Sequence, residues 1–291
     1  MKRVAIVGTG LIGASVGLAL KAGGFQGHIA GWDADAAELA IALKMGAIDE
    51  ALPGREAVLA AKADVYVLAT PVMAIMDWMQ QLAPSVGKGQ LVTDVGSTKR
   101  EIALLAGKLY GAQGQALFLP GHPMAGKESG GAALAEAGLF NGATWLFTPL
   151  DDFTSGIEEL WRIQVGRFGA HVRELSPQQH DEVCAWVSHL PQMVSTALAA
   201  LLEDTFSHDP EGMAAVQAIG GRALRETTRL GASPYSMWRD VALTNTGPIS
   251  QTLLALEQRL AHLRENLRTP GMRDEFTMAN RFKAGSGNSA T

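Results

Sequence analysis

Three glycines near the start of the chain have the spacing of a phosphate-binding turn. They lie in the motif Gly8-Thr9-Gly10-Leu11-Ile12-Gly13, directly after an apolar run and before an expected helix. In such a turn the first glycine permits a tight bend, the second lets the backbone approach a pyrophosphate, and the third lets the helix pack closely on the strand. The helix N-terminus then faces the anion with its N–H groups and its dipole. We therefore predict a dinucleotide site formed by Gly8, Gly10, Leu11, Ile12 and Gly13.

Two polar residues at the ends of later strands extend this site. Asp33 comes 20 residues after Gly13, where a carboxylate accepts hydrogen bonds from a ribose diol and repels a 2′-phosphate. The sequence therefore favours NAD over NADP; the alternative is that Asp33 caps a helix expected over Asp35–Lys44. Thr70 follows another buried strand and is expected to line the dinucleotide site. Alternatively, Thr70 is an N-cap with Pro71 at the first helical position.

Ser97 and His122 also follow expected strands, and both side chains can take part in proton transfer. The imidazole of His122 lies in the stiff segment Pro120-Gly121-His122-Pro123 and can accept a proton near neutral pH. Taken alone, His122 fits a structural role equally well, and Ser97 is suited to be the N-cap of a helix over Lys99–Leu109. The two residues are therefore candidates for acid–base chemistry beside a nicotinamide.

A parallel sheet must position these residues, and the chain up to about residue 175 has the pattern of one. Short β-branched runs alternate with longer segments rich in Ala, Leu, Lys and Glu, as in βαβ units. The expected strands are VAIVG, HIAGWD, DVYVLAT, QLVTDVG, ALFLPG, ATWLFTP and HVREL. The expected helices between them include Ile12–Ala22, Ala34–Lys44, Ile75–Leu82 and Lys99–Leu109.

After Ser176-Pro177 the strand patterns stop and long amphipathic helices follow. We therefore predict an α/β protein in which an N-terminal Rossmann-type, doubly wound, mostly parallel sheet precedes an all-helical C-terminal dimerisation domain. The expected boundaries are 1–175 for the NAD-binding domain, 176–284 for the helical substrate-binding domain and 285–291 for a disordered tail. The apolar surplus of the helical part indicates a homodimer, although it also fits a plain core.

The charge, the apolar runs and the cysteine count limit which partners and which cellular compartment are expected. The net charge of -5, without a basic stripe, argues against nucleic acid as a partner. No apolar run is long enough to span a membrane, and the first run lacks the pattern of a signal peptide. The single cysteine, Cys184, excludes an intramolecular disulfide and a Cys-rich zinc site, and no metal is expected. These features fit a reducing cytoplasm.

Three motifs resemble one enzyme family. They are Asp94-Val95-Gly96-Ser97-Thr98-Lys99, Gly121-His122-Pro123-Met124-Ala125-Gly126 and Ser188-His189-Leu190-Pro191. In this order they closely resemble the prephenate and arogenate dehydrogenase family of tyrosine biosynthesis, and the resemblance runs from the glycine turn to about Arg264. It implies that His122 accepts the proton of the substrate's ring hydroxyl while hydride leaves the same carbon for NAD. It also implies that Ser97 hydrogen-bonds that hydroxyl and orients the histidine.

The resemblance further implies a small-molecule dicarboxylate substrate and a set of residues that bind it. Arg229 matches the family's substrate-binding arginine, whose planar fork suits a carboxylate. From the residues alone a surface arginine fits equally, and Arg222, Arg225 and Arg239 compete for the role. His180 and Ser188, eight apart on one expected helix, match positions that line the substrate cleft, or they are polar core residues. Glu128 matches an acid that pairs with the arginine and gates the cleft.

The chain departs from the family pattern at two positions near the expected side-chain end of the substrate. Gln192 stands where many members have histidine, and Lys127 where many have threonine. An amide can donate to the keto oxygen of prephenate or accept from the ammonium of arogenate, so the choice between the substrates stays open. We expect no fused mutase segment and no added regulatory domain, so that feedback by tyrosine would act at the active site.

Two other functions compete with this hypothesis. A 3-hydroxyacid dehydrogenase or an imine reductase also places a Rossmann-type half before helices, but such enzymes depend on a catalytic lysine or on different loop motifs. A non-catalytic NAD-sensing protein would need only the glycine turn and Asp33. The presence of Ser97, His122 and Arg229 together argues against a sensor.

Overall fold

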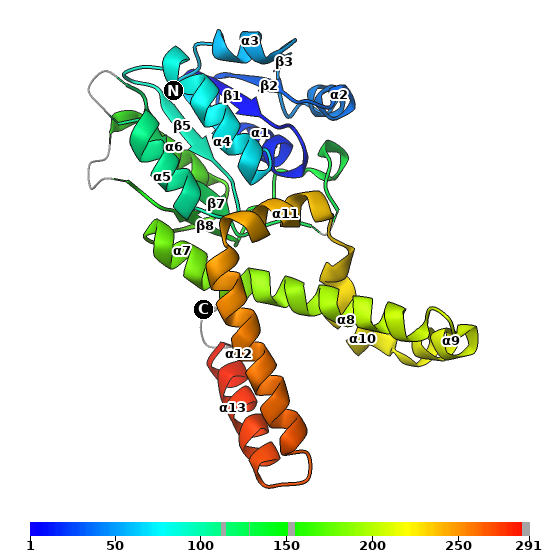
Figure 1. Ribbon diagram of the computed structural model, residues 1–291. Helices are drawn as coiled ribbons and strands as arrows, with labels where there is room; N and C mark the ends of the chain where they lie inside the picture. The colour runs from blue at the N-terminus through cyan, green and yellow to red at the C-terminus, as the bar shows by residue number, and fades with distance from the viewer. Residues whose placement is uncertain (112–114, 128, 151–154, 287–291) are drawn as a thin grey trace. The chain divides into compact units, whose positions relative to one another are not determined.

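The computed structural model describes residues 1–111, 115–127, 129–150 and 155–286. The chain forms two compact units, Met1–Thr246 and Gly247–Thr291. The division expected near residue 175 falls inside the first unit and stays a prediction. Figure 1 follows the chain from end to end.

A six-stranded parallel sheet forms the centre of the first unit. Its strand order is β3-β2-β1-β4-β5-β6, the order of Rossmann dinucleotide-binding sheets. The strands are β1 (Arg3–Val7), β2 (His28–Trp32), β3 (Glu50–Ala51), β4 (Val65–Leu68), β5 (Leu91–Asp94) and β6 (Leu117–Leu119). The order reverses between β1 and β4, so the carboxyl ends of these two strands border the crevice where such sheets bind ligands.

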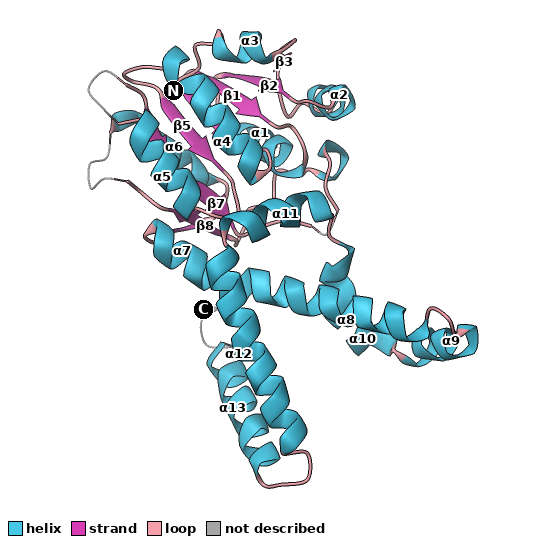
Figure 2. Cartoon of the chain, in the orientation of Figure 1, coloured by secondary structure: helices cyan, strands magenta, loops and turns pink. Residues whose placement is uncertain are grey.

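Helices cover both faces of the sheet, as the doubly wound prediction requires (Figure 2). Alternate residues of β1 point to opposite faces: Val4 and Ile6 belong to one buried cluster, and Ala5 and Val7 to the other. The first cluster includes side chains of α1 and α6, and the second those of α4 and α5. The helices of this part are α1 (Leu11–Ala22), α2 (Ala36–Lys44), α3 (Arg55–Leu59), α4 (Val72–Leu82), α5 (Arg100–Leu109) and α6 (Gly156–Arg167), with 3₁₀ turns η1 (Ala83–Ser85) and η2 (Ala132–Leu134).

The last predicted strands form a second sheet instead of extending the first. This three-stranded sheet has the order β7-β8-β9, from β7 (Gly121–Pro123), β8 (Thr144–Phe147) and β9 (His171–Glu174). The run expected as one strand, ALFLPG, divides at Pro120 into β6 and β7. Proline has no N–H to donate, so the ladder of the large sheet ends at Leu119. β7 then pairs antiparallel with β8, and β8 pairs parallel with β9.

From residue 176 onward the described chain is helical, as predicted. The first unit ends with α7 (Pro177–Cys184), the π-helix η3 (Ala185–His189), α8 (Leu190–Phe206), α9 (Pro210–Ile219), α10 (Gly221–Thr228), the 3₁₀ turn η4 (Arg229–Ala232) and α11 (Tyr235–Thr244). The fold class predicted from the sequence is therefore confirmed.

The second unit is a pair of helices. They are α12 (Thr246–Glu265) and α13 (Gly271–Ser286), joined by a short turn. Arg259 of α12 forms an ion pair of 2.6 Å with Glu275 of α13. Helix α13 includes Gly285 and Ser286, which we expected in the disordered tail, and residues 287–291 lie outside the described part.

Two carboxylates of the helical segment cap helices that flank the sheet. Asp181 of α7 accepts hydrogen bonds from the backbone N–H groups of Lys99 (2.7 Å) and Arg100 (2.9 Å), at the start of α5. Asp240 of α11 accepts from the N–H of Met73 (3.1 Å), at the start of α4. Neither α4 nor α5 has a side-chain cap at its own N-cap residue. The caps satisfy the free N–H groups and place negative charge at the positive end of each helix dipole.

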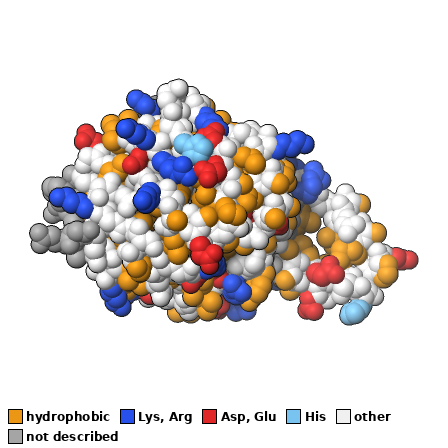
Figure 3. Space-filling view, turned by 90° about the horizontal axis from the view of Figure 1, so that it is seen from above, with side chains coloured by type: hydrophobic (Ala, Val, Ile, Leu, Met, Phe, Trp, Pro, Cys, Tyr) orange, Lys and Arg blue, Asp and Glu red, His pale blue; other side chains and the backbone are white. Residues whose placement is uncertain are grey.

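The surface carries both signs of charge. On the face shown in Figure 3, acidic and basic side chains are interspersed among apolar ones, without a large field of one sign. No described helix combines the length and the apolar character that crossing a membrane requires.

Candidate active site

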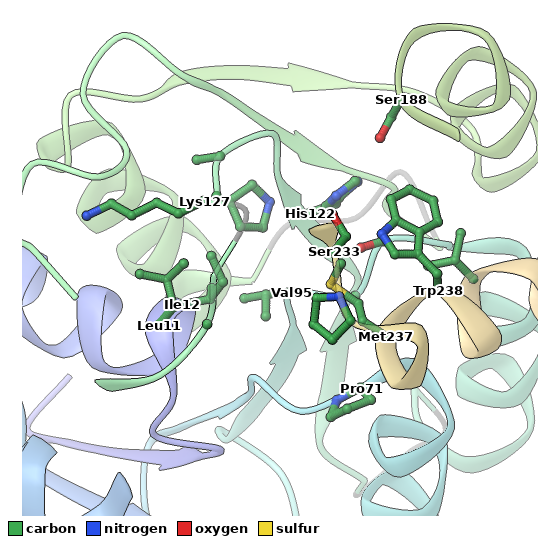
Figure 4. A pocket seen from close by; sticks show the side chains of 18 of the residues that line it. Leu11, Ile12, Pro71, Val95, His122, Lys127, Ser188, Ser233, Met237 and Trp238 are labelled. Carbon is green, nitrogen blue, oxygen red and sulfur yellow. The ribbon is translucent and has the colours of Figure 1, made fainter. Parts of the chain in front are cut away.

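A pocket of about 580 Å³ lies within the first unit, where β1, β4 and β5 end. Its walls come from the turns after these strands, from the segment around β7, and from helices beyond residue 180 (Figure 4). Of the predicted site residues, those lining it are Gly10, Leu11, Ile12, Thr70, Ser97, His122, Lys127, Ser188, Gln192 and Arg229. Residues far apart in the sequence, chosen for their chemistry, thus share one pocket.

The three glycines of the turn meet different surroundings. Gly8 has a φ of +92°, and a Cβ there would lie 2.5 Å from the carbonyl oxygen of Ala69. A Cβ on Gly13 would lie 1.8 Å from the carbonyl oxygen of Gly8. A Cβ on Gly10, in contrast, would meet nothing within 4 Å, and Gly10 borders the pocket. The turn is therefore packed tightly at Gly8 and Gly13 and open at Gly10, an arrangement that fits a pyrophosphate at the N-terminus of α1.

Asp33 lies beside the glycine turn. Its Oδ2 accepts hydrogen bonds from the backbone N–H (2.6 Å) and the hydroxyl (3.4 Å) of Thr9, and its Oδ1 accepts from the N–H of Asp35. The cap of α2 is Asp35, whose carboxylate accepts from Ala37. The alternative that Asp33 caps this helix is therefore wrong.

Thr70 borders the pocket and is not a helix cap. Helix α4 begins at Val72 with Pro71 as its N-cap residue, so the alternative of Thr70 as cap with Pro71 at the first helical position is wrong. The Thr70 hydroxyl is buried and has no hydrogen-bond partner among the described residues. It is therefore available to a bound ligand.

Ser97 and His122 border the pocket from the ends of two different sheets. Ser97 follows β5, and His122 is the central residue of β7, where it pairs with Leu146 of β8. The alternative of Ser97 as cap of α5 is wrong, because the N-cap residue is Lys99 and the capping carboxylate is that of Asp181.

Asp94 joins the backbone segments that carry Ser97 and His122. One of its oxygens accepts from the N–H of Gly96 (2.8 Å), and the other accepts from the N–H of Gly121 (3.2 Å). Its charge is balanced by a fully buried ion pair with Lys99. Both residues stand in the motif Asp94-Val95-Gly96-Ser97-Thr98-Lys99, from which no role for either was predicted. An acid and a lysine five residues apart at a buried strand end are the only sequence signal for this pair.

His122 is bonded to a second buried histidine. Its Nδ1 lies 2.9 Å from Nε2 of His180, and Nδ1 of His180 lies 2.8 Å from Oδ1 of Asp181. Burial lowers the pKa of His122 well below its ordinary value, and the nearby His180 and Lys99 lower it further. Burial also lowers the pKa of His180, against the raising effect of its hydrogen bond to Asp181. His122 is therefore neutral near pH 7 and able to accept a proton.

The expectation that His180 lines the substrate cleft with Ser188 is wrong for this structure. His180 is fully buried and does not border the pocket, whereas Ser188 does. The expectation assumed one regular α-helix, but the π-helical segment η3 lies between α7 and α8. Its wider turn changes the phase of the helix, so residues eight apart no longer share one face.

The polar atoms of Gln192 are engaged by the protein itself. Its amide nitrogen donates to the carbonyl of Leu230 (2.7 Å) and to Thr196 (3.1 Å), and its carbonyl accepts from the Ser233 hydroxyl (3.2 Å). Arg229 begins η4, directly before Leu230. Gln192 therefore holds the segment that carries Arg229, in addition to bordering the pocket.

The three competing arginines do not border the pocket. Arg222 is exposed and pairs with Glu226, and Arg239 pairs with the buried Asp240. Arg225 lies on α10, and of the four arginines only Arg229 is among the residues lining the pocket.

Lys127 lies away from the position we expected. In Figure 4 it lies on the side of the pocket with Leu11 and Ile12, whereas Ser188 and Trp238 lie on the other side. Its ammonium forms an ion pair with Glu136 (3.0 Å) and donates to the carbonyl of Leu134 (2.9 Å). Glu128 lies outside the described residues.

An apolar wall opposite the glycine turn was missed in the sequence. Met237 and Trp238 of α11 border the pocket beside Ser233 (Figure 4). Their only signal was the turn sequence Gly231-Ala232-Ser233-Pro234, which predicts a helix start just before them.

The sheet order, the open glycine turn and a neutral histidine in one pocket define a Rossmann-type oxidoreductase. Comparison with known proteins identifies the family. The model of "Prephenate dehydrogenase, nucleotide-binding domain" matches residues 16–172, and that of "Prephenate dehydrogenase, dimerization domain" matches residues 176–282. The chain belongs to the prephenate dehydrogenase family, as its motifs predicted.

Similar proteins agree with this assignment. The chain is 34% identical to the prephenate dehydrogenase of Bacillus subtilis over 84% of its length, and it spans 65% of the length of that relative. The structure is similar to the Aquifex aeolicus prephenate dehydrogenase in complex with hydroxyphenyl propionate and NAD+, with a TM-score of 0.86, 28% identity and coverage of 99% and 98% of the two chains. It is also similar to the Synechocystis arogenate dehydrogenase, with a TM-score of 0.76, 28% identity and coverage of 98% and 99%.

Proposed function

We propose that this protein catalyses the NAD-dependent oxidative decarboxylation of prephenate, arogenate or both, giving 4-hydroxyphenylpyruvate, tyrosine or both. The observation that carries the proposal is the placement of His122. A buried, neutral imidazole borders the same pocket as Ser97, Gly10 and Arg229. Proton acceptor, dinucleotide turn and carboxylate-binding cation are thus assembled around one cavity.

His122 and Ser97 act on the ring hydroxyl. Ser97 hydrogen-bonds the hydroxyl, and His122 takes its proton as the C–H bond on the same carbon loses hydride. NAD, when bound, accepts that hydride. The ring carbonyl that forms draws electrons from the bond to the ring carboxylate, so carbon dioxide leaves and the ring becomes aromatic. Aromatisation makes the step effectively irreversible.

Arg229 binds a substrate carboxylate. A guanidinium offers two parallel N–H donors to a carboxylate, which fixes orientation as well as charge. Ser188 lies on the same side of the pocket as Trp238 and extends the substrate wall. Gln192 contributes by holding Arg229's segment. Because the Gln192 amide is already hydrogen-bonded to the protein, groups other than this amide must distinguish the keto acid of prephenate from the amino acid of arogenate.

The cofactor is NAD in this proposal. The space at Gly10, the unpartnered hydroxyl of Thr70 and the N-terminus of α1 fit a dinucleotide along Gly8, Gly10, Leu11, Ile12 and Gly13. The carboxylate of Asp33 lies beside the turn, where its charge disfavours the 2′-phosphate of NADP. Lys127 lies on this side of the pocket, where its ammonium is paired with Glu136.

The wider organisation follows the same proposal. Residues 1–175 form the NAD-binding domain and 176–284 the helical domain, through which two copies associate in the cytoplasm. A match to a dimerization domain over 176–282 supports the homodimer. Sedimentation velocity at several concentrations tests it, and a sedimentation coefficient that fits a monomer throughout contradicts it.

Specificity constants for prephenate and arogenate, each with NAD and with NADP, test the function in one panel. We expect NADH formation with at least one of the two substrates and a preference for NAD. A 3-hydroxy acid and a cyclic imine serve as controls, because the enzymes that use them are the competing hypotheses. Among the described residues, neither Lys99, buried against Asp94, nor Lys127, paired with Glu136, is placed as the catalytic lysine of those enzymes. Absence of turnover with both cyclohexadienyl acids would refute the proposal.

A further inference from the structure

A continuous chain of hydrogen bonds leads from His122 away from the pocket. His122 Nδ1 contacts His180 Nε2 at 2.9 Å, and His180 Nδ1 contacts Asp181 Oδ1 at 2.8 Å. His180 is fully buried and Asp181 is 2% exposed, so water does not compete for these bonds. Asp181 is held in turn by the backbone N–H groups of Lys99 and Arg100.

The order of donors along this chain follows from its fixed end. The Asp181 carboxylate accepts, so His180 donates through Nδ1–H. A neutral His180 then has a lone pair on Nε2 and can only accept there. His122 must therefore donate through Nδ1–H, which leaves Nε2 unprotonated. This nitrogen is the one that remains for the pocket.

The neighbours of His180 do not offer another role for it. Cys184 Sγ lies 3.6 Å from His180 Nε2, and the ligand atoms of His122, His180 and Cys184 lie within 4.8 Å of one another. Burial raises the pKa of the Cys184 thiol to about 12, which disfavours the thiolate that binds metals. The two histidine nitrogens that face each other are already joined by a hydrogen bond. The geometry fits a proton-ordering chain and not a metal centre.

We propose that His180 and Asp181 are positioning residues that hold His122 in the Nδ1–H tautomer, with the lone pair of Nε2 directed to the substrate hydroxyl. This proposal rests on the proposed function, in which His122 is the proton acceptor. Free imidazole side chains in water prefer the opposite, Nε2–H tautomer. Without His180, His122 would present a hydrogen-bond donor to a hydroxyl whose proton it has to accept.

The same chain stabilises His122 after proton transfer. The imidazolium keeps its Nδ1–H bond to His180, and the Asp181 carboxylate polarises His180 toward the new positive charge. A charge-assisted chain of this kind is worth more inside a protein than in water. The role assigned to Ser97, to orient the histidine, is thus shared with His180.

The tautomer of His122 is the first test, because it needs neither substrate nor turnover. Nitrogen-15 NMR of histidine-labelled wild-type protein at about pH 7.5 distinguishes protonated from unprotonated ring nitrogens, with His122 assigned from the spectrum of His122→Asn. We expect His122 to carry its proton on Nδ1. A wild-type His122 protonated on Nε2 would overturn the proposal even if the enzyme turns over prephenate. Absence of turnover would instead count against the proposed function alone.

Kinetics of two His180 variants provide the second test. His180→Leu removes the acceptor, and we expect kcat to fall about 10²-fold, in the range that a positioned base contributes, with little change in KM. His180→Gln can accept from His122 through Oε1 and donate to Asp181 through Nε2, so it should recover most of the rate. Cys184→Ala, which removes a buried neighbour of His180 without removing the chain, is the matched control and should keep the wild-type kcat.

Three outcomes would contradict the positioning role. One is wild-type kcat in His180→Leu. Another is a raised KM with unchanged kcat, which would indicate a substrate contact. The third is a folded His180→Gln as slow as His180→Leu. If His180→Leu fails to fold, as judged by circular dichroism, the wild-type tautomer and the His180→Gln rate still decide the question.

Discussion

Burial gives His122 and Arg229 different tasks in the same pocket. His122 is 8% exposed and neutral, which suits a group that takes a proton during the reaction. Arg229 is on an exposed turn, and its guanidinium offers a planar fork of N–H donors, which suits a group that binds a substrate carboxylate. Catalytic rate and substrate affinity should therefore depend on different residues.

Replacing His122 tests the first task. We expect His122→Asn to lower kcat about 10²- to 10⁴-fold with a much smaller change in KM, because the amide cannot take up the hydroxyl proton. Steady-state NADH formation measures both constants, and retention of near-normal kcat would show that the proton goes elsewhere.

Replacing Arg229 tests the second task. Arg229→Ala should raise the KM for the dicarboxylate at least about tenfold, since a hydrogen-bonded charge pair typically contributes more than 1.4 kcal/mol. Arg222→Ala is the matched control, because Arg222 is exposed, pairs with Glu226 and does not border the pocket. Similar KM values in the two variants would show that Arg229 does not bind the substrate carboxylate.

The pH dependence of kcat/KM reports His122 in the free enzyme. Because burial, His180 and Lys99 hold its pKa well below 6.5, activity should stay constant as the pH falls from about 7.5 through 6.5. The rate should fall only at lower pH, when the imidazole binds a proton and can no longer accept one. An acidic limb centred at or above pH 6.5 would contradict this environment for His122.

The site residues that could be predicted from the sequence are those whose neighbours in the chain mark them. Gly10, Ser97 and His122 each follow an apolar run, so their place at the strand ends could be predicted from neighbouring residues. The role of His180 could not, because its partner His122 lies 58 residues earlier and the link needs the folded chain. The buried pair of Asp94 and Lys99 could not be predicted either, because an acid and a lysine near the end of a strand usually face solvent.

At the scale of elements, different glycines at the start of α1 serve packing and cofactor binding. A Cβ at Gly13 collides with the backbone of Gly8, whereas a Cβ at Gly10 has open space toward the pocket. We expect Gly13→Ala to lower the melting temperature by several degrees, since the backbone itself must move. Gly10→Ala should leave stability nearly unchanged and raise the KM for NAD, because its methyl group occupies the approach to the pyrophosphate. Thermal melts and NAD titrations of both variants check the two halves of this prediction, and equal melting temperatures would contradict the first.

Element boundaries show where local patterns stop being informative. The parallel strands and their helices were predictable, because hydrophobic period and glycine turns determine them within a few residues. The change of sheet at Pro120 and the π-helix between α7 and α8 were not. The caps of α4 and α5 also escaped prediction, since their capping carboxylates, Asp240 and Asp181, come from 167 and 82 residues away.

At the scale of the whole molecule, three buried histidines make the fold sensitive to acid. Burial lowers the pKa of His122, His180 and His189, that of His189 to about 4. Above pH 6.5 both folded and unfolded forms are neutral, so these groups contribute nothing. Below pH 6.5 the unfolded chain binds protons that the folded chain cannot, so the free energy of unfolding falls.

Urea denaturation at about pH 7.5 and about pH 5 measures this loss. For His189 alone the difference in pKa corresponds to about 2 kcal/mol at pH 5. A His189→Gln variant should lose less stability over the same interval. Carboxylates with lowered pKa values, such as Asp49, weaken the fold only at lower pH, near and below their ordinary value of 3.8. Equal stability of the wild type at both pH values would contradict the neutral state of the three histidines.

Asp181 belongs both to the cap of α5 and to the chain that ends at His122. During synthesis the sheet and its glycine turn leave the ribosome before residue 181 does, so a dinucleotide site can form first. At that stage His122 has no partner to fix its proton. Under the positioning role proposed for His180 and Asp181, the Nδ1–H tautomer of His122 is fixed only once α7 packs against the start of α5. Under the same proposal, a chain in which α7 is not packed against α5 would keep its glycine turn but would lack a correctly oriented base at His122.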